Sequence, residues 1–163
     1  KAVSSIIKRK YVRYFIAKFL ISWYHICMKE NLIHYRTCVC NINYHMVWSV
    51  KYRRKILSAE VEAYLQKLVQ EIAEDKGFTV HLFECGEGDH VHCFVSAPPK
   101  LSITAIMKYL KGISGRKLFE RFPEIRNQLW KGELWNHSYY VETVGTVSEE
   151  NIRRYIEHQS KAY

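Results

Sequence analysis

The stretch from residue 78 to residue 99 constrains the fold most. It contains FTVHLFEC, then GEG, then DHVHCFVS, and it ends at a double proline. β-Branched and aromatic residues favour strands, a short turn containing glycine favours a hairpin, and proline cannot donate to a strand ladder. The stretch therefore predicts two antiparallel strands, over 78–85 and 89–96, joined by a tight turn at 86–88.

Two helices are predicted on either side of this hairpin. Ser58 is expected to begin a helix that Gly77 ends, because serine favours the start of a helix and glycine its end. A second helix is expected from Ser102 onwards, with basic residues on its polar side. Gly112 and Gly115 are expected to bend or break that second helix.

The remaining elements complete a mixed fold. Further strands are predicted over 37–50 and 138–144, and a last helix is predicted after Ser148. The order is strand, helix, strand, strand, helix, strand, helix. This order predicts the α+β class: a ferredoxin-like or RRM-like antiparallel sheet with helices on one face, plus a C-terminal helix.

The charge of the chain is unevenly distributed. The chain has 163 residues, the length of one ordinary domain, and a formal net charge of +9, which favours a polyanionic partner. Residues 1–27 hold six basic and no acidic side chains, whereas the rest carries 19 basic and 16 acidic ones. We therefore expect a basic N-terminal extension over 1–27, upstream of a natural start at Met28, and one functional domain over 28–163.

The two histidines of the hairpin are the first candidate site. Side chains alternate along a strand, so His90 and His92 share one face while Val91 and Cys93 share the other. The apolar face must pack under helices, which leaves the imidazoles on the more open face. Two imidazoles beside Asp89 fit a divalent ion such as Mg²⁺ or Mn²⁺, used as a Lewis acid. Ordinary hydrogen-bonded histidines would give the same pattern.

The last predicted helix supplies partners for this pair. In EENIRRYIEHQSKAY, Tyr155 and Gln159 stand one turn apart, on the face with Ile152 and Ile156 that must dock on another element. If this helix covers the open sheet face, Gln159 can complete the coordination of the metal and Tyr155 can point at the same ion. A phenol near a metal-polarised phosphate can act as a nucleophile. A tyrosine on an apolar helix face is also an ordinary core residue.

Four stretches, in this order, closely resemble the single-tyrosine HUH transposases of the IS200/IS605 insertion-sequence family: YHMVWSVKYRRKIL, HVH, YYVETVG and YIEHQ. The similarity covers about residues 40–160. The resemblance implies that His90, His92 and Gln159 are the metal ligands. It also implies that Tyr155 is the nucleophile, which forms a 5′-phosphotyrosine with DNA.

The resemblance further implies a substrate and an assembly. Such a transposase cleaves and rejoins single-stranded DNA at the ends of its insertion sequence and recognises imperfect hairpins there. Family members work as homodimers in which the tyrosine is supplied in trans. Basic side chains bind phosphates and aromatic rings stack on bases, although a solvated basic loop has the same composition. The candidate DNA contacts are Lys51, Tyr52, Arg53, Arg54, Lys108, Lys111, Arg116 and Lys117.

Other functions share parts of this pattern. A related HUH nickase, such as a repeat-associated tyrosine transposase, would use the same residues on a different DNA. A non-catalytic RRM-like module would bind nucleic acid without metal or a covalent product, and a metallohydrolase would cleave with water. Five cysteines without a framework spacing favour reduced thiols, hence a cytoplasmic protein. The resemblance further implies a nucleoid-associated protein of a prokaryote. No membrane partner is expected, since Lys18 interrupts the N-terminal apolar run.

Overall fold

The computed structural model describes residues 32–129, 132–145 and 149–159. It divides the chain into two compact units, with the boundary between Asn41 and Ile42. The predicted extension over 1–27 lies outside the described residues.

The first unit contains a small antiparallel hairpin. Its strands are β1 (Ile33–His34) and β2 (Val39–Cys40). A backbone hydrogen bond of 2.8 Å from Tyr35 N to Cys38 O closes the turn between them. The segment 37–50, predicted as one strand, is therefore interrupted: β2 ends at Cys40 and the next strand begins at Asn43.

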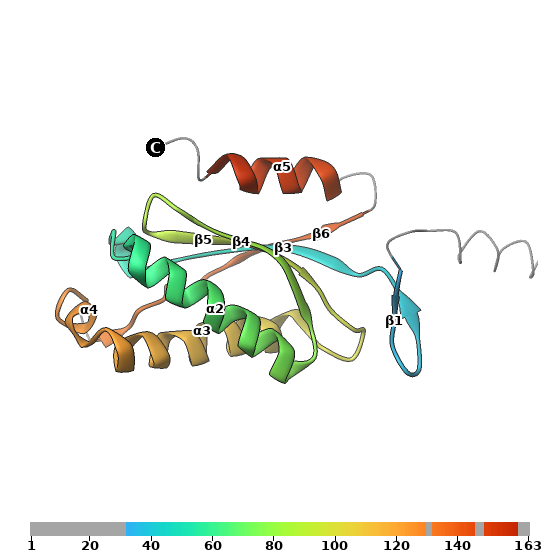
Figure 1. Ribbon diagram of the computed structural model, residues 1–163, viewed down its shortest axis with the longest axis horizontal. Coiled ribbons are helices and arrows are strands. Elements are labelled where there is room, and N and C mark those ends of the chain that lie inside the picture. The colour runs from blue at the N-terminus through green and yellow to red at the C-terminus, as the bar shows by residue number, and fades with distance from the viewer. Residues whose placement is uncertain (1–31, 130–131, 146–148, 160–163) are drawn as a thin grey trace, which may run out of the picture. The chain divides into compact units, whose positions relative to one another are not determined.

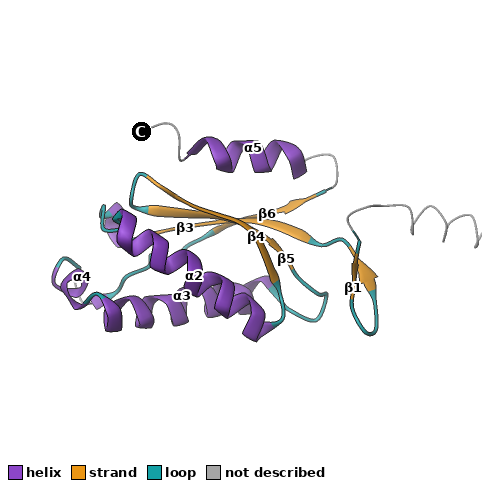
Figure 2. Cartoon of the chain, in the orientation of Figure 1, coloured by secondary structure: helices purple, strands orange, loops and turns teal. Residues whose placement is uncertain are grey.

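The second unit is built on a four-stranded antiparallel sheet in the order β4-β5-β3-β6. This order makes β5 and β3 the central strands. A short 3-10 helix (Lys51–Arg53) and α2 lie between β3 and β4, and α3 and α4 lie between β5 and β6 (Figures 1 and 2). This arrangement is ferredoxin-like and confirms the predicted fold class. The elements are β3 (Asn43–Ser49), α2 (Ala59–Lys76), β4 (Thr79–Gly86), β5 (His90–Ser96), α3 (Ile103–Arg121), α4 (Pro123–Asn127), β6 (Tyr140–Val144) and α5 (Glu149–Gln159).

Helix α2 has the limits that its sequence predicts. Ser58 precedes it in an extended conformation, and Gly77 ends it with a φ of 73°. This left-handed conformation suits glycine because it has no Cβ. The N–H of Gly77 donates to the carbonyl of Ala73 at 2.9 Å, which satisfies one of the last free carbonyls of the helix.

The predicted break in α3 is wrong, and a bend there stays a prediction. The helix runs without interruption from Ile103 to Arg121, through both Gly112 and Gly115. Gly115 is buried against the indole of Trp135, and Trp135 Nε1 donates a 2.9 Å hydrogen bond to Ser114 Oγ. A glycine inside a helix costs about 1 kcal/mol relative to alanine, which packing of this kind offsets.

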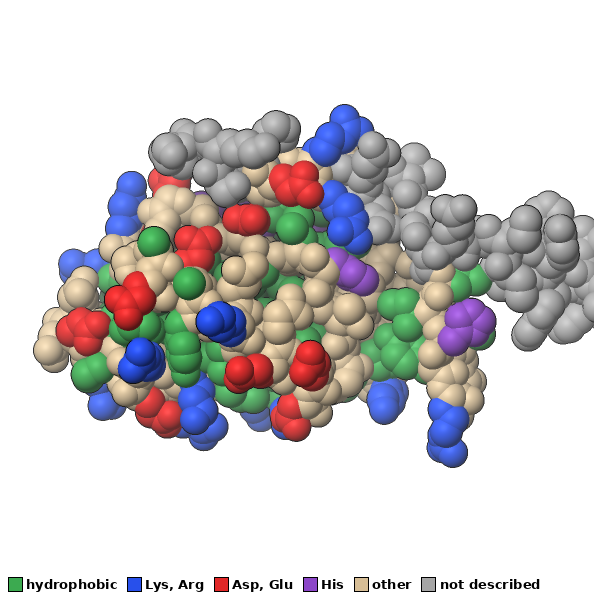
Figure 3. All heavy atoms as spheres, viewed as in Figure 1, with side chains coloured by type: hydrophobic (Ala, Val, Ile, Leu, Met, Phe, Trp, Pro, Cys, Tyr) green, Lys and Arg blue, Asp and Glu red, His purple; other side chains and the backbone are tan. Residues whose placement is uncertain are grey.

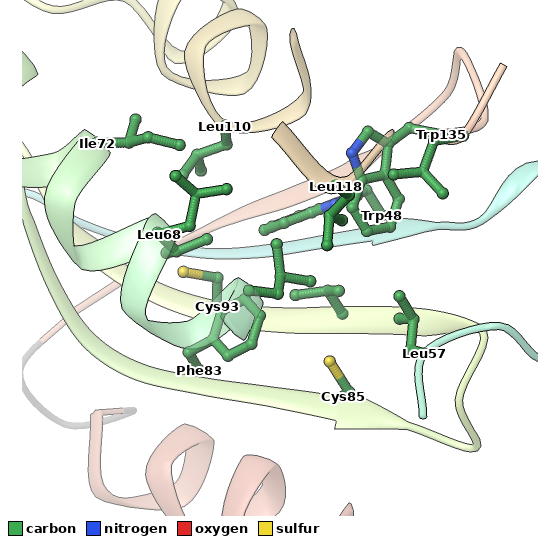
Figure 4. Packing of buried hydrophobic residues seen from close by; sticks show 14 of the residues in the cluster. Trp48, Leu57, Leu68, Ile72, Phe83, Cys85, Cys93, Leu110, Leu118 and Trp135 are labelled. Carbon is green, nitrogen blue, oxygen red and sulfur yellow. The ribbon is translucent and has the colours of Figure 1, made fainter. Parts of the chain in front are cut away.

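The main hydrophobic core lies between α2, α3 and one face of the sheet (Figures 1 and 4). Trp48 and Trp135 meet edge to face there, with ring centroids 6.0 Å apart. Full burial of one large apolar side chain contributes about 1.5–3 kcal/mol to stability, so this cluster is the stable base of the unit. Its members in Figure 4 include Leu68, Ile72, Phe83, Cys85, Cys93, Leu110 and Leu118.

Helix α5 covers the opposite face of the sheet (Figure 1). Its Ile156 is fully buried in a second, smaller apolar cluster with Phe94 of β5 and Val144 of β6. Leu82 and Ile152 pack against this cluster. The last helix therefore docks on the face that carries the two histidines, as its apolar pattern predicts.

The surface over α2 does not gather charge of one sign. Figure 3 shows acidic and basic side chains intermingled there. In the part of the chain that the structure describes, no helix has both the length and the apolar character needed to cross a membrane.

Candidate active site

Strand β5 supplies the two histidines, and they lie on the face covered by α5. Their neighbours Val91 and Cys93 lie in the main core, as the alternation predicts. The imidazoles are close together, with ring centroids 5.1 Å apart, but they are only 8% (His90) and 4% (His92) exposed. The expectation of an open face is therefore wrong at these positions, because side chains from β3, β4 and α5 enclose the rings.

A chain of polar contacts holds His90. Its Nδ1 lies 2.6 Å from Oδ1 of Asp89, and Oδ2 of Asp89 lies 3.0 Å from Nε of Arg53. Asp89 is buried, and a buried carboxylate requires such partners. Because a carboxylate only accepts hydrogen bonds, Nδ1 of His90 carries a proton. Nε2 of the neutral ring is then left with a lone pair.

The turn after β3 brings Arg53 to this carboxylate. Tyr52 and Arg53 adopt left-handed conformations, with φ of 59° and 53°. Such conformations cost about 1–3 kcal/mol for residues other than glycine, so surrounding contacts must hold them. Arg53 N donates to Val50 O at 3.0 Å, and Lys51 N donates to Leu134 O at 2.8 Å. The composition of the KYRRK segment did not predict this turn.

His92 is paired with a histidine from the neighbouring strand. Its Nδ1 lies 3.1 Å from Nε2 of His45, and the two rings stack at 16° with centroids 5.3 Å apart. Burial, and then the nearby His90, His45 and Arg53, lower the pKa of His92 to about 4. Burial also lowers the pKa of His45, against the opposing effect of Glu142. Both rings are therefore neutral near pH 7, the form of imidazole that binds metals.

Tyr155 of α5 lies over this pair. Its ring centroid is 5.6 Å from that of His92 and 6.1 Å from that of His45, in edge-to-face contacts. Burial of Ile156 orients the helix, while Tyr155 itself remains 50% exposed. The structure thus brings the predicted nucleophile to His92, one of the predicted ligands, within one chain.

The predicted third ligand is only partly located. Gln159 is the last residue of α5, but its side chain lies outside the described part of the structure. Among the described side chains, no group of three or more His, Cys, Asp or Glu residues is arranged to hold a metal ion. The donors in place are two imidazoles whose Nδ1 atoms have partners at 2.6 and 3.1 Å, so a metal would have to bind at their Nε2 atoms and would require a further ligand.

The basic residues after β3 have different environments. Lys51 forms an ion pair with Glu133, and Arg53 is committed to Asp89. Tyr52 is 60% exposed, and Arg54 is also exposed. Of this group, the described contacts link only Arg53 to the histidine pair, and they do so through Asp89.

The basic residues of α3 lie away from the histidines, because α3 covers the other face of the sheet (Figure 1). Lys108 is exposed, and Arg116 and Lys117 form ion pairs with Glu120. The Lys111 ammonium donates to the carbonyls of residues 136 and 137 at 2.5 and 2.9 Å. The structure therefore separates this predicted DNA-contact group from the candidate active site.

Two further site residues were missed in the sequence. His45 alternates with Met46 and Trp48 of the core, so the same alternation that placed His92 could have placed it on the histidine face. Gly86 pairs with His90 across β4 and β5, and a Cβ there would clash with Nε2 and Cε1 of the His90 ring. Only the strand register shows this close approach.

A ferredoxin-like sheet with two histidines on a central strand, and a tyrosine near them on the last helix, is the arrangement that the resemblance to single-tyrosine HUH transposases implies. The family model for IS200-like transposases matches residues 38–159. The chain belongs to this family. DNA strand transfer is the activity that the membership implies.

Two curated relatives agree with this assignment. The ISDra2 transposase TnpA of Deinococcus radiodurans is 40% identical over 124 residues, which cover 76% of this chain and 88% of that protein. The transposase for insertion sequence element IS200 of Salmonella typhimurium is 35% identical over 119 residues, 73% of this chain and 77% of that protein.

Solved structures share the fold. A crystal structure described as a transposase from Deinococcus radiodurans superposes with a TM-score of 0.64 at 36% identity, covering 78% of this chain and 97% of that one. A REP-associated tyrosine transposase bound to a REP hairpin gives a TM-score of 0.52 at 12% identity, covering 77% and 68%. The second likeness concerns the fold alone.

Proposed function

We propose that this chain cleaves and rejoins single-stranded DNA at the ends of an insertion sequence, with Tyr155 as the nucleophile. The observation that carries the proposal is the approach of the Tyr155 ring to His92 and His45, at 5.6 and 6.1 Å between centroids. Tyr155 is half exposed above buried imidazoles. This contrast supports a role at a reacting phosphate, because a tyrosine that served only the core would itself be buried.

In the proposed cleavage step, the phenol oxygen of Tyr155 forms a bond to phosphorus while the bond from phosphorus to the 3′ oxygen breaks. The phenol loses its proton to solvent, and the departing 3′ oxygen takes up a proton to become a free hydroxyl. The product is a 5′-phosphotyrosine. Rejoining is the reverse step with the 3′ hydroxyl of another strand, so it requires no ATP.

A divalent ion, Mg²⁺ or Mn²⁺, is proposed at His90 and His92, with Gln159 as the third protein ligand. When bound, such an ion polarises the phosphate as a Lewis acid. The chain's own contribution is to hold the imidazoles in fixed orientations. Asp89 orients His90, and burial favours the neutral form of His92.

The proposed substrate is a hairpin at each end of the element. A protein of the same fold is described as bound to a REP hairpin, and the proposal extends that kind of ligand to this chain. We further propose a homodimer with Tyr155 supplied in trans. In the single chain Tyr155 lies at its own histidines, so supply in trans requires α5 to leave this face.

A covalent-adduct assay tests the proposal directly. We expect the full chain, given labelled single-stranded DNA from the element's ends and Mn²⁺ or Mg²⁺, to yield a labelled protein band on a denaturing gel. EDTA should remove that band. Mass spectrometry of the labelled peptide should locate the phosphate on Tyr155.

Two other results would contradict the proposal. A metal-dependent nick without an adduct would identify water as the nucleophile, as in a metallohydrolase. DNA binding that gives neither nick nor adduct would identify a non-catalytic module.

Gly86→Ala is expected to impair cleavage while leaving the fold intact. The new Cβ would clash with the end of the buried His90 ring, which must move and so loses its place beside Asp89, at a cost of about 1–3 kcal/mol in stability. We expect adduct formation to fall by about 10- to 100-fold, the scale for disturbing a metal site from its surroundings. Adduct yield and thermal unfolding would be measured together.

Gly112→Ala is the matched control for this change. It lies on the exposed side of α3, and a Cβ there would meet no atom within 4 Å. The control should keep full activity. Unchanged cleavage by the Gly86→Ala chain would show that the His90 position does not matter to the reaction.

A further inference from the structure

His45 is a buried histidine to which the proposed ligand set and nucleophile assign no role. In the β3–β5 ladder it lies opposite Phe94, diagonal to His92, so the two imidazoles overlap. Their rings stack at 5.3 Å with an angle of 16°, and Nε2 of His45 lies 3.1 Å from Nδ1 of His92.

This hydrogen bond can have either of two directions. If His45 donates, Nδ1 of His92 accepts and the proton of the neutral His92 ring lies on Nε2, which then cannot bind a metal. If His92 donates from Nδ1, its Nε2 has the free lone pair that a metal requires. In the hydrogen bond between His90 and Asp89, the Nδ1 of the histidine is likewise the donor, since a carboxylate only accepts hydrogen bonds.

We infer that His45 is a positioning residue: its Nε2 accepts the Nδ1 proton of His92 and so presents Nε2 of His92 to the divalent ion. The inference rests on the proposed function. It gives the two histidines equivalent supports, Asp89 for His90 and His45 for His92. Such outer partners orient metal-binding imidazoles and set which nitrogen is free.

The surroundings of His45 hold its ring in this place. Tyr155 and Tyr140 contact it edge to face, with centroids 6.1 and 6.3 Å away. Glu142 lies opposite it on β6. Two tyrosine rings and the neighbouring strand β6 therefore surround His45. They fix the position of its Nε2 relative to His92, as a positioning role requires.

The test compares His45→Phe, which keeps an aromatic ring but has no acceptor, with His45→Gln, whose amide oxygen can take the place of Nε2. Mn²⁺ affinity of the full chain without DNA would be measured from the EPR signal of free Mn²⁺. We expect affinity to fall by about 10- to 100-fold in His45→Phe and to stay near the original in His45→Gln. Adduct formation by His45→Phe should recover at saturating Mn²⁺.

A folded His45→Phe chain with undiminished Mn²⁺ affinity would overturn the inference while leaving the proposed function in place. If the unchanged chain neither bound Mn²⁺ nor formed an adduct, the proposed function itself would fail and the inference with it. Should His45→Phe not fold, His45→Asn replaces it, because its shorter amide cannot reach the Nε2 position. Equal Mn²⁺ affinities for His45→Asn and His45→Gln would then overturn the inference.

Discussion

Tyr155→Phe is expected to abolish the covalent DNA adduct and to lower strand cleavage by more than about a thousandfold, the scale of loss when a covalent nucleophile is removed. The change removes one oxygen from a half-exposed ring, so the packing of α5 through Ile156 is kept. DNA affinity and the unfolding temperature should stay near their original values. The gel assay, a binding titration and a thermal melt measure the three quantities on the same preparation.

Tyr140→Phe is the control for this prediction. Tyr140 also contacts the ring of His45, is similarly exposed, and donates a 3.1 Å hydrogen bond to Glu142. We expect this variant to keep forming the adduct. If Tyr155→Phe still formed the adduct and Tyr140→Phe did not, the nucleophile would be Tyr140 of β6 and not Tyr155.

His92→Ala is expected to remove metal-dependent cleavage. Loss of an outer partner lowers metal affinity or activity by about 10- to 100-fold, so loss of a proposed ligand should cost at least about 100-fold in Mn²⁺ affinity. The change also leaves a cavity and removes the hydrogen-bond partner of His45. We therefore expect stability to fall by about 1–3 kcal/mol, which urea unfolding would measure.

His137→Ala is the control for this prediction, because it also removes an imidazole but does so outside the candidate site. His137 is exposed, and its side chain contacts Glu133 outside the candidate site. This control should bind Mn²⁺ and cleave DNA as before. Full Mn²⁺ affinity in a folded His92→Ala chain would rule out His92 as a ligand.

Much of the fold could be predicted from local patterns. The period-two alternation of β5 placed His90 and His92 opposite Val91 and Cys93, and the apolar positions of α5 predicted its docking. These predictions succeed because a strand or helix must bury one face whatever it packs against. Which face of the sheet α5 covers was only a condition of the prediction, and the packing of Ile156 on Phe94 and Val144 shows it.

The site's finer geometry depends on contacts that sequence patterns do not contain. His45 and His92 are 47 positions apart and meet only through the β3–β5 register. Arg53 reaches Asp89 through two left-handed residues in a segment without glycine. Gly115 stays helical where it packs against Trp135, a tertiary contact that outweighs its low helix propensity, and the exposed Gly112 lies within the same continuous helix.

The alternation of β5 also limits how this protein can vary over evolutionary time. One inserted or deleted residue within His90–Ser96 would exchange the two faces of the strand downstream of the change. Deletion of Val91 would turn the imidazole of His92 into the main core and bring the side chain of Cys93 to the place that His92 now occupies. We therefore expect changes of length in the loops between elements rather than within this strand.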